Sequence, residues 1–317
     1  MATDREAAGR ACPLHYRYRP EQLGQDPEAW PEQVLYVAGG LYGNPFALDA
    51  IESMVAQERA AGRSVRLLFN GDFNWFNADD TLFRTINNRV LRHDAMLGNV
   101  EYELAQPSDS AGCGCAYPEF VDDGVVSRSN RIMQRLQAVA ADQPEIQQQL
   151  RGLARWRCGI FGGLKVLILH GDPESLAGWG LARERLQASG DQRLRQWFRQ
   201  TGADVMVCSH TCLPLLWQGE VDGRLCRVVN NGSAGMANLY GDSRGLIARI
   251  SAMPPFATNL AMLEGHAQTV ALAPVSFDLH AWQGTFDRLW PAGSDAAISY
   301  RDRILQGTGL DASDMLL

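Results

Sequence analysis

The sequence predicts an α/β protein in which helices cover a layered sheet. Its composition is that of a globular protein, with 46% hydrophobic and 21% charged residues among 317. Short apolar runs alternate with stretches of helical spacing along the first two thirds of the chain. A succession of strands then follows, and two helical stretches come last. This succession favours helices packed outside a sheet.

The elements follow from apolar runs bounded by turn residues and from apolar residues at helical spacing. The segment 1–32 is polar and contains three prolines, so we expect an extended arm there and one domain over 33–317. In the first part of that domain we expect strands at 34–38, 65–69, 166–169 and 204–208. We expect helices at 47–60, 80–94, 129–141, 145–158 and 183–200. The stretch 106–125, with Pro, Ser, Gly and two cysteines, predicts a long loop, and such loops are usually functional or mobile.

After residue 212 the alternation of strands and helices gives way to successive strands. The stretches 215–219 and 224–229 flank Asp222-Gly223, which is a strong hairpin signal. Two more strands are expected at 246–251 and 269–275, and two helices near 279–290 and 296–306.

The charge and the cysteine content indicate which partners and which cellular compartment are to be expected. The 29 Lys and Arg against 36 Asp and Glu give a net charge of −7, which disfavours a nucleic-acid scaffold but allows a small anionic substrate. The N-terminus has no apolar core of a signal peptide, and no apolar run reaches the length of a membrane span. The seven cysteines are mostly isolated, which fits reduced thiols in a cytoplasmic protein.

Polar residues collect just past the ends of the expected strands. They are Asp72, Asn99, His170 and His210. Ligands of α/β sheets bind at the carboxyl ends of strands, and carboxylate, amide and imidazole groups together suit a divalent metal. Taken singly, each residue also has a structural explanation: Asp72 could cap a turn, Asn99 could hold a left-handed turn, and each histidine could be hydrogen-bonded in the core.

The order of these motifs resembles the calcineurin-like metallophosphoesterases, especially their small bacterial branch, over about residues 34 to 307. The matching stretches are Gly71-Asp72, Gly98-Asn99-Val100-Glu101, His170-Gly171, Ser209-His210-Thr211-Cys212-Leu213-Pro214 and Asn231-Gly232-Ser233-Ala234-Gly235. The resemblance implies a four-layer α/β/β/α sandwich of two mixed sheets. It also implies a hydrolase of small phosphate mono- or diesters that uses a divalent metal, which could be Mn, Fe, Zn or Ni.

The resemblance implies one intact metal site and one degenerate site. The family's second-metal ligands correspond to Asp72, Asn99, His170 and His210, and the resemblance implies a catalytic role for Asp72 and both histidines. The first-metal ligands are mostly replaced, because Gly40, Tyr42 and Cys212 stand where the family has Asp, His and His. We therefore expect one ion, with a second left open, and weak or atypical activity. Val100 also replaces a histidine that often protonates the leaving group.

The loop cysteines offer a replacement for the first site. Cys113 and Cys115 could join Cys212 and Asp72 in a sulfur-rich site, because thiolates bind zinc and iron well. Alternatively, Cys212 is a small buried hydrophobic residue and the loop pair consists of surface thiols or a strained disulfide. Three functions follow: an atypical phosphoesterase, a non-catalytic binding or scaffold protein of the same fold, or a cysteine-containing metal site with other chemistry. The oligomeric state is left open.

Overall fold

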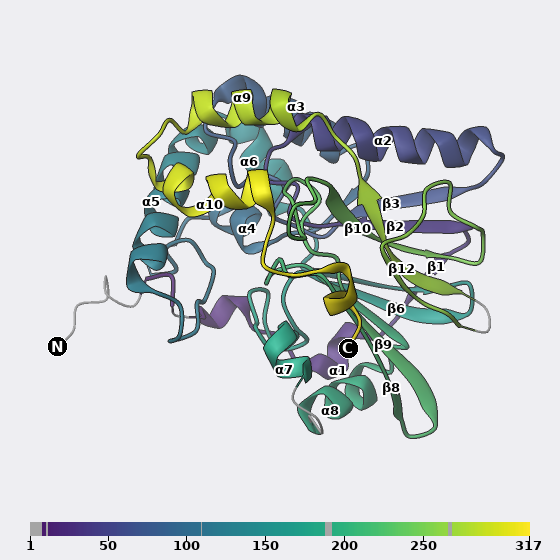
Figure 1. Cartoon of the computed structure of the whole chain (residues 1–317). Helices are drawn as coiled ribbons and strands as arrows, with labels where there is room; N and C mark the ends of the chain where they lie inside the picture. The colour runs from purple at the N-terminus through teal and green to yellow at the C-terminus, as the bar shows by residue number, and fades with distance from the viewer. Residues whose placement is uncertain (1–7, 11, 109, 188–191, 266–267) are drawn as a thin grey trace.

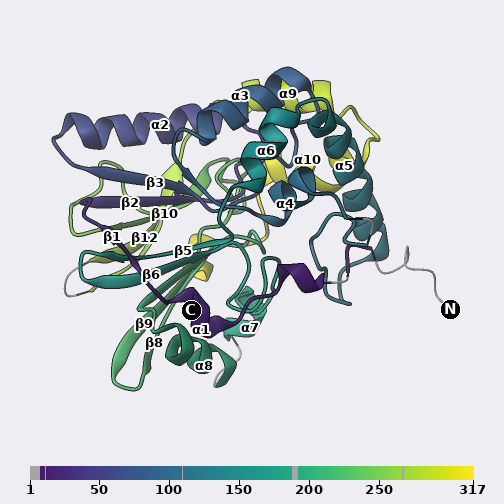
Figure 2. The same cartoon turned by 180° about the vertical axis from the view of Figure 1, so that it is seen from behind.

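The computed structural model describes residues 8–10, 12–108, 110–187, 192–265 and 268–317. Two six-stranded mixed sheets lie face to face, and helices cover their outer faces (Figures 1 and 2). This is the four-layer α/β/β/α sandwich expected from the motifs, and the predicted fold class is confirmed. Within the described ranges, every helix is too short or too polar to cross a membrane.

The first sheet combines parallel and antiparallel pairs. Its strands are β2 (Val34–Ala38), β3 (Val65–Phe69), β4 (Asp94–Ala95), β10 (Gly245–Ser251), β11 (Ala261–Leu263) and β12 (Thr269–Val275). They lie in the order β11-β12-β10-β2-β3-β4. The pairs β2–β3 and β3–β4 are parallel, whereas β10 runs antiparallel to both β2 and β12. Strands β2 and β3 therefore end at the same edge of the sheet.

In the second sheet, the central strands also run parallel and end at one edge of the sheet. Its strands are β1 (Glu28–Trp30), β5 (Trp156–Phe161), β6 (Leu164–Leu169), β7 (Val205–Cys208), β8 (Leu215–Val221) and β9 (Arg224–Asn230), in the order β1-β5-β6-β7-β9-β8. The pairs β6–β7 and β7–β9 are parallel. The expected hairpin is confirmed, and both turn residues, Asp222 and Gly223, have positive φ, as a tight hairpin turn requires.

Helices form the two outer layers. They are α1 (Pro20–Leu23), α2 (Pro45–Ala60), α3 (Asp80–Val90), α4 (Asn99–Ala105), α5 (Asp123–Ala141), α6 (Pro144–Arg151), α7 (Arg183–Gln187), α8 (Gln192–Thr201), α9 (Leu279–Leu289) and α10 (Asp295–Gln306). Helices α2, α3 and α9 lie over the first sheet, and α8 lies over the second (Figure 1).

Strand β2 is buried along its whole length because both faces of its sheet are covered. Leu35 and Val37 join the core between the sheets, whereas Val34, Tyr36 and Ala38 pack under the helices. This two-residue alternation is the pleat of a strand, and burial of both faces explains why the sequence reads as a continuous apolar run.

Several element boundaries differ from expectation. The helix expected at 145–158 ends at Arg151, because Gly152 caps it, and the residues from Trp156 belong to β5. Helix α4, which begins at Asn99, was not predicted. The expected helix 183–200 corresponds to α7 and α8, and residues 188–191 between them lie outside the described residues.

The described part of the expected arm contains α1 and an edge strand. Strand β1 pairs in parallel with β5, and Trp30 packs directly on Gly159, where an added Cβ would come within 2.2 Å of the Trp30 ring. Residues 1–7 and 11 lie outside the described residues. The division of the chain at residue 32 stays a prediction.

Candidate metal centre and its pocket

The loops after the parallel strands meet at one edge of the sandwich. Asp72 follows β3, and His170 and His210 follow β6 and β7. Gly71 has a φ of +100°, and a Cβ there would lie 2.4 Å from the backbone nitrogen of Gly98. The loop that carries Asp72 can therefore touch the start of α4 only if residue 71 is glycine.

Two buried asparagines tie the sheets together beside these loops. Asn231 donates from Nδ2 to the Val37 carbonyl at 3.1 Å and to Asn70 Oδ1 at 3.0 Å. Asn70 in turn donates to the Leu169 carbonyl at 2.9 Å. Because β2 belongs to one sheet and β6 to the other, these bonds fix the relative position of the strands that carry the candidate ligands.

Glu101 holds the Asp72 loop in place. Its carboxylate accepts from the backbone nitrogens of Asp72 (2.6 Å), Phe73 (2.9 Å), Asn74 (3.1 Å) and Gly98 (3.1 Å). Asp72 has a positive φ of 55°, a strained conformation that such a network can maintain. Burial and then the neighbouring charge of Asp72 raise the pKa of Glu101 to about 7, although the N–H donors act in the opposite direction. We assigned no role to Glu101 beyond its place in the motif.

Four acceptor atoms converge at this edge. His170 Nε2 lies 3.0 Å from Asn99 Oδ1, 3.2 Å from His210 Nδ1 and 3.4 Å from Asp72 Oδ1. Asp72, His170 and His210 form the one metal-competent cluster of His, Cys, Asp and Glu among the described residues, with ligand atoms all within 4.8 Å. Asn99 extends this set by its amide oxygen.

The atoms of these side chains that face away from the cluster show how each side chain is oriented. His170 Nδ1 lies 2.9 Å from the Asn70 carbonyl, and His210 Nε2 lies 2.9 Å from the Cys115 carbonyl. Because a carbonyl only accepts, both outer nitrogens carry a proton, so each ring in its neutral form presents a lone pair on its inner nitrogen. Asn99 Nδ2 donates to the Cys113 carbonyl at 3.0 Å, so its oxygen also points inward. Four lone-pair atoms facing one another fit a shared cation, and carbonyls behind the ligands are the usual support of a metal site.

The charges within the cluster are consistent with a cation site. Burial would raise the pKa of Asp72, but the charge of His170 lowers it overall. Burial would likewise lower the pKa of His170, but Asp72 raises it. Burial and then the charge of His170 lower the pKa of His210 to about 4. The cluster thus holds a carboxylate and at least one neutral imidazole near pH 7.

A phenol and a thiol occupy the place of the degenerate site. The Tyr42 hydroxyl contacts Cys212 Sγ, and the Tyr42 ring covers Gly40, where an added Cβ would lie 3.0 Å from the ring. Burial raises the pKa of Cys212 to about 11 and places the pKa of Tyr42 well above its usual range. Both groups therefore remain protonated near neutral pH. Asp72 is then the one anionic ligand left from the first-metal set.

The sulfur-rich replacement site does not assemble among the described residues. The loop does fold back over the strand ends as expected, and Cys113 and Cys115 contact the ligands through their backbone carbonyls. The Cys115 thiol also lies 3.7 Å from Asn99 Nδ2, but the three thiols do not form a shared cluster with Asp72. Their thiols are buried and free, and Cys212 faces Tyr42 instead. The loop thus orients the imidazole and the amide, a role that no side-chain pattern reveals.

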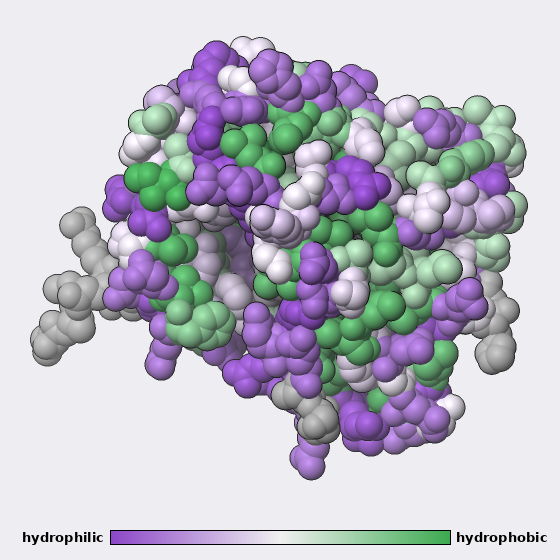
Figure 3. Space-filling view, in the orientation of Figure 1, coloured by the Kyte–Doolittle hydropathy of each residue, from purple (hydrophilic) through white to green (hydrophobic). Residues whose placement is uncertain are grey.

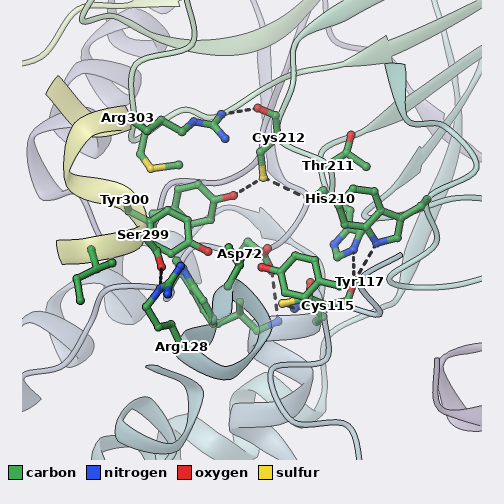
Figure 4. A pocket seen from close by; sticks show the side chains of 18 residues that line it. Asp72, Cys115, Tyr117, Arg128, His210, Thr211, Cys212, Ser299, Tyr300 and Arg303 are labelled. Carbon is green, nitrogen blue, oxygen red and sulfur yellow. Dashed lines mark hydrogen bonds between the residues drawn. The ribbon is translucent and has the colours of Figure 1, made fainter. Parts of the chain in front are cut away.

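A cavity of about 460 Å³ opens in front of Asp72 and His210. Figure 3 shows the molecule hollowed on this face below α10, with both hydrophilic and hydrophobic side chains around the rim. Aromatic side chains form much of its wall, and α10 contributes Ser299, Tyr300 and Arg303 (Figure 4). The aromatic lining residues are Tyr42, Trp75, Tyr117, Trp179 and Tyr300. Arg128 and Arg303 also line the cavity, and nothing in their local sequence marks them, because α5 and α10 meet it only in the folded chain.

The chain has the calcineurin-like phosphoesterase fold, in which two mixed sheets lie between helical layers and the motif residues gather at one edge. No family model matches the chain, and no curated protein matches it. A hypothetical protein from Pyrococcus horikoshii OT3 has a similar structure, with 14% identity, a TM-score of 0.58 and coverage of 87% of this chain and 99% of its own. A metallophosphoesterase from Sphaerobacter thermophilus, 18% identical, matches over 81% of this chain and 93% of its own with a TM-score of 0.48. At such identities the likeness is one of fold.

Proposed function

We propose that this protein is a metal-dependent phosphoesterase that binds one divalent ion and acts on a small phosphate mono- or diester. The ion is held by Asp72, Asn99, His170 and His210. The observation that supports this most directly is the convergence of the two inner imidazole nitrogens, 3.2 Å apart, with a protein carbonyl behind each ring. Neutral imidazoles so arranged lack a proton to share and are suited to a metal ion.

Some of the residues would hold the ion, and others would shape the pocket that binds the substrate. A bound divalent ion supplies Lewis acidity toward a phosphoryl oxygen and lowers the pKa of a bound water. Asp72 contributes the one negative charge of the ligand set, and His170 and His210 keep their outer protons on backbone carbonyls. The aromatic wall limits the water that reaches the substrate. Val100 offers no proton to the leaving group, so we expect activity mainly on esters with good leaving groups.

Metal content and hydrolysis together test this proposal. We expect about one ion per chain by mass spectrometry after loading with Mn²⁺, and slow hydrolysis of an activated phosphodiester. His170→Ala and His210→Ala should each lower metal occupancy sharply, because each removes one of four ligands. His280→Ala is the matched control, since His280 is exposed at the start of α9. Full metal occupancy in both ligand variants would contradict the assignment.

A non-catalytic binding protein of the same fold is the second candidate. It is favoured by the Tyr42–Cys212 contact, which fills the place of the degenerate site. One ion per chain without any turnover of phosphate esters would support this alternative. In either case we propose a cytoplasmic protein, because the described cysteines are all free thiols.

A further inference from the structure

We propose that the Arg303 guanidinium binds phosphoryl oxygens in the pocket and supplies the positive charge that the degenerate metal site cannot. This inference rests on the proposed function, since it concerns the same substrate and the same pocket. It assigns a binding role to α10, a helix that carries none of the matched motifs.

Arg303 lies beside the degenerate site. Its Nη2 donates to the carbonyl of Cys212, the residue whose thiol contacts Tyr42. Figure 4 shows Arg303 reaching from α10 toward Cys212 above the cavity that contains Asp72. The guanidinium therefore stands beside the degenerate site, where Gly40 and Tyr42 provide no ligand for a second ion.

The guanidinium has unused hydrogen-bonding capacity. Its Nε is buried and has no hydrogen-bond partner, and a buried unpartnered donor is costly. Arginine presents five N–H donors in a planar fork that matches two oxygens of a phosphate. The bond to the Cys212 carbonyl uses only one of the terminal donors and holds the fork in a fixed orientation. A phosphate group in the pocket would use the remaining donors.

The charge balance of the pocket favours an anion. Arg128 and Arg303 line it, and Asp72 is the one carboxylate among the lining residues that the structure describes. Arg301, two residues before Arg303, is paired with Asp287, whereas no ion pair is formed by Arg128 or Arg303 in the described part of the chain. An unpaired guanidinium in a chain of net charge −7 is a locally positive element that a dianionic ligand can neutralise.

Placement of Arg303 explains how a one-metal site could act on phosphate esters. In phosphoryl transfer, negative charge on the non-bridging oxygens is stabilised by metal ions and by arginine side chains alike. Arg303 makes and breaks no covalent bond in this scheme. Arg128, held by a 2.7 Å hydrogen bond from its Nε to Ser299 Oγ, adds a second positive charge at the rim.

Phosphate binding provides the test. Inorganic phosphate is titrated by calorimetry into protein with and without Mn²⁺, and metal content is measured in parallel by mass spectrometry. We expect Arg303→Met to weaken phosphate binding by about tenfold or more, as for loss of a charge-assisted hydrogen bond, with metal content unchanged. Arg303→Lys should lose less affinity than Arg303→Met, because it keeps the charge although it lacks the planar fork. Arg301→Met on the same helix, a partly exposed arginine paired with Asp287, is the matched control and should bind phosphate as the unaltered protein does.

Two outcomes would overturn the inference. One is phosphate affinity in Arg303→Met equal to that of the unaltered protein. The other is equal loss in Arg303→Met and Arg303→Lys, which would show that positive charge at this position does not contribute to phosphate binding. Failure of the proposed function gives a different result, namely a protein that takes up no metal. Phosphate binding to the metal-free protein still reports on Arg303 in that case.

Discussion

Replacement of Glu101 by Gln tests how the Asp72 loop is held. Each carboxylate oxygen of Glu101 accepts from two backbone nitrogens: Oε2 from Asp72 and Gly98, and Oε1 from Phe73 and Asn74. A glutamine amide has one acceptor oxygen, so its NH₂ group would face two N–H donors that have no other partner. At about 1–3 kcal/mol for each unsatisfied buried donor, the loss is about 2–6 kcal/mol. This is a large fraction of the 5–15 kcal/mol that is typical of total stability.

Urea denaturation at pH 8, followed by circular dichroism, measures this loss as a free energy of unfolding. Glu103→Gln is the matched control, because Glu103 is equally buried on the same helix and removal of its charge is the same chemical change. Its Oε1 accepts only from the Tyr16 hydroxyl, which can reverse its role and accept from the new amide, so we expect a cost under about 1 kcal/mol. Glu101 is mostly ionised at pH 8 if its pKa is about 7, so a cost for Glu101→Gln no larger than that of the control would refute the reasoning.

Three further predictions concern the two metal sites and the N-terminal strand. Gly40→Asp combined with Tyr42→His should raise hydrolysis of an activated phosphodiester by restoring first-site ligands; activity of the unaltered protein already equal to that of an ordinary two-metal enzyme would argue against a crippled site. Mn²⁺ affinity, measured by calorimetry, should rise with pH through the raised pKa of His170, because a proton on its imidazole competes with the ion; affinity independent of pH from 6 to 8 would contradict this. Gly159→Ala should destabilise the fold by about 1–3 kcal/mol and expose the N-terminal segment to limited proteolysis, because the new methyl group meets the Trp30 ring; unchanged proteolysis would contradict that packing.

The sequence predicts the strands of the sandwich better than its helices. Strands β2 and β3 lie at the expected residues, since a short and mainly apolar run between turn signals is typical of a buried strand. The expected helix over 145–158 fails at its end because Trp156, Arg157 and Cys158 belong to β5, an interior strand of the second sheet. Only the hydrogen-bonded pairing of this segment with β1 and β6 distinguishes a strand from a helix here. The pairing with β1 joins residues far apart in the sequence, so local sequence patterns do not reveal it.

The candidate site shows the same division between local and tertiary signals. The ligands could be proposed from motif order, because each follows a strand and carries a metal-binding group. The groups that orient them could not, since the supporting atoms are backbone carbonyls of Cys113 and Cys115, which any residue supplies. Arg303 was missed for another reason: it is one of several arginines near the end of the chain, and only the position of α10 over the cavity distinguishes it from Arg301.

The position of α10 over the cavity also has a consequence for biosynthesis. Arg303 is translated 91 residues after Cys212, which corresponds to roughly 5–20 seconds at 5–20 residues per second. All four groups that converge on the candidate ion precede that interval. The residues that fix these four groups in place, including Asn231 and strand β10, are made within that interval and still before Arg303. Arg303 is therefore the last side chain of the cavity wall to be synthesised, and the cavity stays open on the α10 side until the chain is almost complete.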